Sequence, residues 1–267
     1  MPLRPEPMMH HDGATKNAGE RHAAKRFLAQ WRQDHPHVKC IVTEDSLRAN
    51  APHIETLQAH ALHSILGVTE GDHALLFQQV QAAEHAGHVT YDERHDRAAG
   101  LLHRCRVVND VPLKASNPDV RVNGIEYWEI GGDKVLHCSW VTDLRVSRRN
   151  VFRLMRGGRA RWKIAHETCN TLNNQGDHFE HTYGHGTQHL SVVCAAVMML
   201  ALLVDQTQQL CCALCRAVWT KWGSKRLLWE RIRALFDAYA LKSMRQLLAT
   251  LWYGLKKLQP RLAVDSS

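Results

Sequence analysis

The chain has 267 residues, 45% of them hydrophobic and 22% charged, and carries a formal net charge of +8. This balance is typical of a soluble globular protein with one large domain or two small ones, and the positive charge favours a polyanionic partner. The N-terminal residues 1–16 lack the apolar core of a signal peptide, and the apolar run from Leu190 to Val204 falls short of the about 20 residues that cross a bilayer. We therefore expect a cytoplasmic protein that does not bind membranes.

The first third of the chain alternates between helical and strand patterns. Apolar residues recur at helical spacing over 20–32, the β-rich run 38–43 predicts a buried strand, and Pro52 marks the start of a helix over 52–61. A second buried strand is expected at 63–68 and a further helix at 71–86. This strand–helix–strand–helix order predicts an α/β core.

The pattern changes at about residue 87. Residues 88–142 alternate in polarity between turn signals, and Gly131–Gly132–Asp133 suits a hairpin connection. We interpret this stretch as antiparallel β structure inserted into the core.

The remainder of the chain, after residue 145, is expected to be helical. Gly157–Gly158 is expected to divide the stretch 145–163 into two helices. One long apolar, buried helix should follow at 188–215, and two amphipathic helices at 224–240 and 241–257.

Two acids are the candidate catalytic residues and metal ligands. Asp45 closes the first predicted strand, where open α/β sheets place their chemistry, and Glu167 lies on a later helix. Carboxylates that converge from separate elements can hold the divalent metals of phosphodiester chemistry. Alternatively, Asp45 caps the following helix and Glu167 is a solvated helix acid.

Residues 145–163 hold eight arginines and lysines and no acid. Arg159, Arg161 and Lys163 surround Trp162, so these cations could hold DNA phosphates while the indole stacks on a base. The alternatives are a solvated charged face and a tryptophan that packs in the core.

Two further groups resemble metal sites only loosely. Four histidines occur in a glycine-containing stretch, but their spacing is not that of a tight zinc motif. These are His178, His181, His185 and His189. Cys212 and Cys215 form a single CxxC without the second ligand pair that a structural zinc needs.

Four segments together resemble the DDE transposases of bacterial insertion sequences. They are VTEDSLRANAPHIETL (42–57), ILGVTEGDHALLF (65–77), SWVTDLRVSRRN (139–150) and GRARWKIAHETCNTLNNQGDHFEHTYGHG (158–186). The resemblance implies a ribonuclease H-like fold interrupted by a β-rich insertion. It also implies DNA cleavage and strand transfer at transposon ends, with carboxylates holding Mg²⁺.

The resemblance also implies a domain organisation and site residues. It divides the chain into a partial ribonuclease H-like core (1–86), a β-rich insertion (87–144), returning catalytic and core helices (145–215), and C-terminal helices (216–267). The family's strand-end Asp matches Asp45, and Ala165 stands where the family has its catalytic helix Glu. Glu167 matches a second acid of the family pattern and would be the ligand in a different helix register. The family's first catalytic Asp is expected upstream of residue 1, and no stretch of this sequence supplies it.

These departures predict a truncated copy without strand-transfer activity, because the carboxylate set that Mg²⁺ requires is incomplete. Its expected partners are double-stranded DNA transposon ends, another copy of itself or a full-length relative. A DNA-binding module without catalysis and a non-functional remnant are the alternatives.

Overall fold

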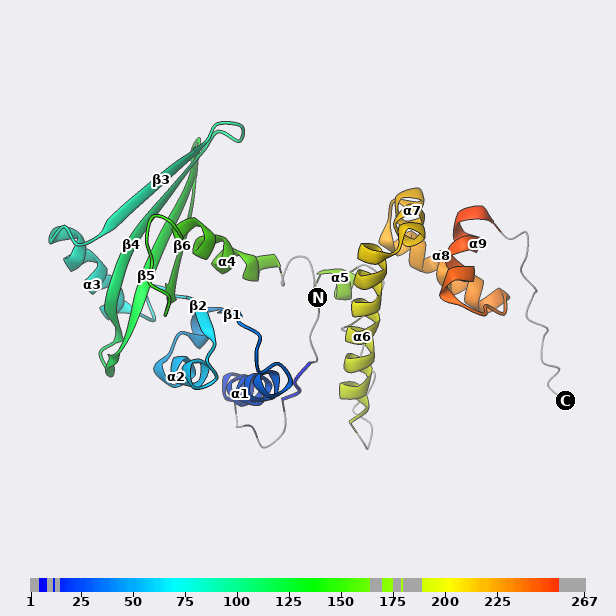
Figure 1. Cartoon of the computed structure of the whole chain (residues 1–267), viewed down its shortest axis with the longest axis horizontal. Coiled ribbons are helices and arrows are strands. Elements are labelled where there is room, and N and C mark those ends of the chain that lie inside the picture. Colours follow the sequence, from blue (N-terminus) through cyan, green and yellow to red (C-terminus); the bar gives the residue numbers. More distant parts are fainter. Residues whose placement is uncertain are drawn as a thin grey trace. The chain divides into compact units, whose positions relative to one another are not determined.

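The computed structural model in Figure 1 describes residues 5–8, 12, 15–163, 170–174, 179 and 189–254. The chain divides into two compact units. One unit comprises Met8–Ala165 and contains the sheet, and the other combines Met1–Pro7 with His166–Ser267, whose described elements are helices.

The sheet of the first unit has six strands in the order β1-β2-β6-β5-β4-β3. Strands β1 and β2 run parallel, and every other neighbouring pair is antiparallel. The bounds are β1 Ile41–Glu44, β2 His63–Gly67, β3 Thr90–Asp96, β4 Leu101–Lys114, β5 Asn117–Gly131 and β6 Lys134–Thr142. The first unit is therefore an α/β structure built on one mixed sheet.

The predicted β-rich region joins the sheet directly. Strand β6 pairs with β2 from Ile65↔Thr142 to Gly67↔Trp140, so β3–β6 extend the sheet that β1 and β2 begin. The predicted hairpin is confirmed, because Gly131 pairs with Lys134 and Gly132 adopts a φ of 56° in the turn.

Three helices precede or connect the strands. They are α1 Lys16–Asp34, α2 Ala51–Ala59 and α3 Ala74–His85, which confirms the helices expected in this part of the chain. The Thr15 side chain caps α1, and Asn50 caps α2 by accepting a hydrogen bond from the His53 amide.

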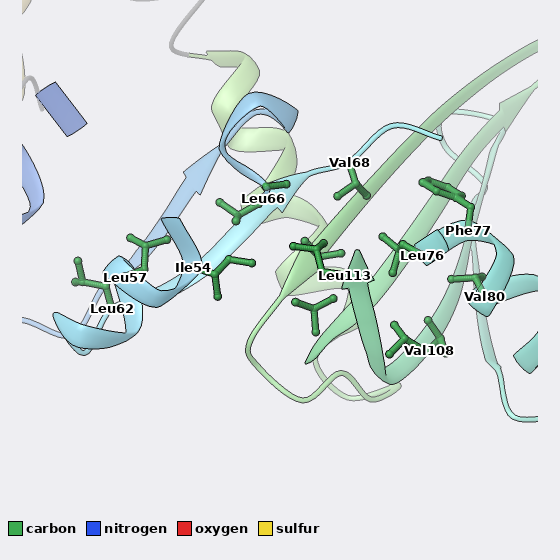
Figure 2. Close-up of a cluster of buried hydrophobic side chains, with 14 of the residues drawn as sticks. Ile54, Leu57, Leu62, Leu66, Val68, Leu76, Phe77, Val80, Val108 and Leu113 are labelled. Carbon is green, nitrogen blue, oxygen red and sulfur yellow. The ribbon is translucent and has the colours of Figure 1, made fainter. Parts of the chain in front are cut away.

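Apolar residues of these helices form a core with one face of the sheet, shown in Figure 2. Ile54 and Leu57 of α2 lie in this cluster, as do Leu76 of α3 and Val108 and Leu113 of β4. The alternation of side chains along a strand sends the intervening residues to the other face.

Helix α4 (Val151–Lys163) forms the core on the other face of the sheet. It runs without interruption through Gly157 and Gly158, so the expectation of two helices is wrong. A Cβ at Gly158 would lie 2.6 Å from the Trp140 ring, and one at Gly157 would lie 2.9 Å from Ile65. The glycines thus allow α4 to approach β2 and β6 closely.

The second unit contains α5 Asn170–Asn174, α6 Leu190–Cys211, α7 Ala213–Trp222, α8 Lys225–Ala238 and α9 Met244–Tyr253. The long helix predicted over 188–215 is wrong, because Cys212 has extended backbone and ends α6. The two amphipathic helices are confirmed as α8 and α9. They pack with α7 around Val218, Leu228 and Leu247.

Helix α6 is less buried than its composition predicts. Among its 22 residues Leu202 is the one classed as buried, whereas Val197 and Leu200 expose more than half of their surface. The helix is also long and apolar enough to cross a membrane by length and composition alone, because it continues past Val204 to Cys211. Core helices of soluble proteins meet the same criterion.

Candidate nucleic-acid interface

Two neighbouring acids at the end of β1 have separate partners. Glu44, the last residue of the strand, pairs with Nε2 of the buried His53 on α2. The carboxylate of Asp45, the next residue, lies 3.6 Å from the guanidinium of Arg161 on α4. Both members of the Asp45–Arg161 pair remain accessible, with 47% and 39% of their side chains exposed. Such an exposed pair contributes at most about 1 kcal/mol, so a ligand can displace it at little cost.

The Asp45–Arg161 pair lies in a cleft of about 410 Å³, here called the strand-end cleft. Trp162 and Gly158 of α4 also line it, as does Thr69 after β2. Three of the predicted site residues, Asp45, Arg161 and Trp162, therefore meet in one cleft, although more than a hundred positions separate Asp45 from the other two in the sequence.

Two acids that line this cleft, Glu44 and Glu70, were not among the predicted site residues. Glu70 lies three residues beyond the end of β2 and lines the cleft together with Asp45. A signal was present, because the tripeptide Val-Thr-Glu occurs at the end of β1 and again after β2. Neighbouring parallel strands end at the same edge of a sheet, so this repetition predicts that both acids lie at that edge.

Arg159 points to the sheet rather than to the strand-end cleft. Its guanidinium pairs with Glu129 of β5 and donates a hydrogen bond of 3.2 Å to the hydroxyl of Tyr127. That hydroxyl in turn donates to Glu129 over 2.7 Å, and Nδ1 of His103 lies 2.7 Å from it. Because the hydroxyl proton is directed at Glu129, the imidazole must be the donor in its contact.

These contacts shift the pKa values of both acidic groups. The pKa of Glu129 is lowered, chiefly because its carboxylate accepts the hydrogen bond from Tyr127, with Arg159 adding to the effect. The pKa of the Tyr127 hydroxyl is raised, first by burial and then by the Glu129 carboxylate. The phenol therefore stays protonated at neutral pH, and Arg159 has its charge balanced within the protein.

The cations of α4 are divided between two hollows. Arg161 lines the strand-end cleft, whereas Arg156, Arg159 and Lys163 line a larger cavity between α4 and the sheet. Trp162, with 58% of its surface exposed, lines both. Helical periodicity explains the division, because residues three and four positions apart share a face and Arg161 lies between them.

The described residues do not assemble a magnesium site. No three His, Cys, Asp or Glu side chains in this part of the chain lie close enough to hold a metal ion. Glu167 and the Ala165 position lie outside the described residues. The carboxylates of the strand-end cleft therefore do not by themselves fit a tightly held Mg²⁺, which requires near-octahedral oxygen ligands.

The structure describes one member of the histidine group and both cysteines of the CxxC. His178, His181 and His185 lie outside the described residues, and His189 precedes α6 with a φ of 60°. Cys212 has a structural position, since its Sγ accepts a hydrogen bond from the Cys215 amide at the start of α7. Burial raises the pKa of the Cys215 thiol.

No family model matches the chain, and no curated protein matches it. The function is therefore inferred from the residues of the strand-end cleft and of α4.

Proposed function

We propose that this chain is a DNA-binding protein of the DDE transposase type, with a ribonuclease H-like core, that holds duplex DNA at the strand-end cleft without strand transfer. One observation carries the proposal. Asp45 at a strand end and Arg161 with Trp162 on a returning helix line the same cleft. The resemblance to transposases likewise implies that a strand-end acid and a basic helix lie at one site.

The chemistry of α4 supports contact with a phosphate backbone. Its thirteen residues include five cations and no acid. A guanidinium binds phosphate oxygens through two parallel N–H groups, and Arg161 is half-exposed beside the cleft. Each phosphate that such a cation neutralises releases counterions, which makes binding dependent on salt.

The proposal does not include catalysis. Ala165 stands where the transposase resemblance expects the helix glutamate, and alanine provides no oxygen for a metal. Mg²⁺ binding through Asp45 and Glu167 therefore remains a family expectation. A DNA-binding protein of this kind would act on transposon ends alone, with a second copy, or with a complete relative.

Binding of a fluorescein-labelled 30-base-pair duplex, followed by anisotropy between 50 and 200 mM KCl, tests the proposal. We expect log K to fall linearly with log salt concentration, and Arg161→Gln to weaken binding about threefold to tenfold. Arg104→Gln is the matched control, because Arg104 is equally exposed but pairs with Glu93 on the face of the sheet opposite α4. Wild-type protein that does not bind duplex, or equal losses in both variants, would overturn the proposal.

A parallel incubation with transposon-end DNA and Mg²⁺ should yield no joined product, and a joined product would refute the absence of strand transfer.

The same protein should unfold cooperatively in urea. A broad, non-cooperative transition with early aggregation would instead support a non-functional remnant.

A further inference from the structure

The larger cavity beside α4 is distinct from the strand-end cleft. It has a volume of about 700 Å³ and lies between α4 and the strands β3–β6. Volumes of about 300–1,000 Å³ are those of small-molecule sites. All its lining residues belong to the α/β unit, so the cavity does not depend on how the two units are placed.

Four cations line this cavity, and within the part of the chain that the structure describes one of them is paired with an acid. Arg159 pairs with Glu129, as described above. Among the described residues, no carboxylate lies within ion-pairing distance of the other three, which are Arg94, Arg156 and Lys163. Several like charges around one partly enclosed space concentrate positive potential and attract an anion.

The walls between these cations are aromatic and apolar. Phe152 lies beneath the guanidinium of Arg94, with 3.9 Å between the Arg94 Cζ and the ring centroid. Met155 of α4 and Tyr127 of β5 also line the cavity, as does the exposed indole of Trp162. An inorganic anion needs only the cations, whereas these surfaces also suit a planar ring.

We propose that this cavity binds one nucleotide unit, with its phosphate on Arg156 and Lys163 and its base against Trp162. Arg94 is held over Phe152 and faces the same cavity, so it can approach a second anionic oxygen. The nucleotide unit can be a free mononucleotide or one residue of a single strand. Duplex DNA at the strand-end cleft is a separate interaction, because Arg161 does not line this cavity.

Isothermal titration of the full chain with thymidine monophosphate, thymidine and inorganic phosphate tests the ligand class. We expect the monophosphate to bind more tightly than either of its parts. Trp162→Leu should weaken that binding roughly tenfold, as loss of one base-stacking contact does. Phosphate that binds as tightly as the nucleotide, with no effect of Trp162→Leu, would overturn the proposal, as would the absence of nucleotide binding.

The contribution of the cations is tested with the double variant Arg156→Gln/Lys163→Gln. We expect it to lose at least tenfold in affinity for thymidine monophosphate. Arg153→Gln is the matched control, because Arg153 is an exposed arginine of the same helix that lines neither hollow. Equal weakening by Arg153→Gln would reduce the effect to general surface charge and overturn the site. Unchanged urea transitions of all variants exclude unfolding as the cause.

A hexathymidylate titration identifies the source of the nucleotide. Affinity at least tenfold above that of the mononucleotide, with a steeper salt dependence, supports a single strand. Equal affinity supports a free nucleotide. Arg161→Gln should leave both titrations unchanged while it weakens duplex binding, so failure of this site and failure of the strand-end cleft give different results.

Discussion

Helix α6 is more apolar than α4, yet α4 is the more buried of the two helices. Five of the thirteen residues of α4 are buried although the helix carries five cations. Helix α6 has 22 residues and no lysine or arginine, yet Leu202 is its one buried residue in the described structure. A helix packs by one face, so apolar residues stabilise the packing most when they share that face. In α4 they do so at Val151, Leu154 and Gly158, which are spaced three and four positions apart.

The largest expected effect comes from removing one leucine from each helix. Leu154→Ala in α4 should lower the free energy of unfolding of the α/β unit by about 2–4 kcal/mol, because Leu154 is buried and leaves a cavity. Leu200→Ala in α6 should change the free energy of unfolding of the helical unit by less than about 0.5 kcal/mol, because 59% of Leu200 is exposed. Native-state hydrogen exchange of peptides from each unit measures both. Similar losses of stability in the two variants would contradict the difference in burial between α4 and α6.

A second, smaller effect is expected where α4 crosses the sheet. Gly158→Val should destabilise the α/β unit by about 1–3 kcal/mol, because its Cβ would fall 2.6 Å from the Trp140 ring and force α4 outward. Gly71→Val serves as the control, since a Cβ there meets no atom within 4 Å. Urea unfolding followed by circular dichroism distinguishes the two. An unaltered midpoint for Gly158→Val would mean that α4 packs less closely than described.

The polar contacts of α4 should make the stability of the α/β unit depend on pH. The lowered pKa of Glu129 stabilises the fold above about pH 4.3, the ordinary glutamate value, and this contribution is lost as pH falls through the folded-state pKa. Glu129→Gln should therefore flatten the loss of stability between pH 5 and pH 3. The exposed Glu55→Gln of α2 is the control. Urea midpoints across this range measure the effect, and parallel acid limbs for wild type and Glu129→Gln would contradict it.

The raised pKa of Tyr127 acts at the opposite end of the range. Its contribution is present below about pH 10, the ordinary tyrosine value, and is lost as pH rises above it, because unfolding then releases a proton. Tyr127→Phe should flatten the alkaline limb of the stability profile, which urea midpoints between pH 9 and pH 11 would measure. An alkaline limb as steep as that of the wild type would contradict this assignment.

The smallest effect is a difference in thiol reactivity that leaves stability unchanged. Burial raises the pKa of the Cys105 thiol to about 12, and the residue has no exposed surface, whereas Cys211 at the end of α6 is exposed. Iodoacetamide at pH 8 should therefore label Cys211 and spare Cys105 until urea is added. Peptide mass spectrometry reads out both sites, and early labelling of Cys105 would show that the sheet opens more readily than its packing implies.

Local patterns predicted most of the elements but not how they meet. The hairpin at Gly132 follows from its turn chemistry, and β1 and β2 follow from short apolar runs, because these signals act between near neighbours. The burial predicted for the first strand is wrong, because β1 lies at the edge of the sheet and none of its four residues is buried. The prediction that Gly157–Gly158 divides a helix was wrong. Low helix propensity there is outweighed by the packing of α4 on Trp140 and Ile65, which no local pattern reveals.

The candidate site was predictable only in part for the same reason. Asp45, Arg161 and Trp162 were singled out from residue type and position, and the fold brings them into one cleft. Glu70 was missed, although its Val-Thr-Glu context repeats that of Glu44, because its relevance depends on β1 and β2 being parallel neighbours.

The sequence by itself determined the α/β character of the first unit, the positions of its strands and the positive charge of α4, since these follow from composition and short-range periodicity. Only the tertiary structure decided which cation faces which hollow. Arg159 turns to Glu129 while Arg161 faces Asp45, because the rotation of α4 about its axis is set by the contact of its glycines with the sheet.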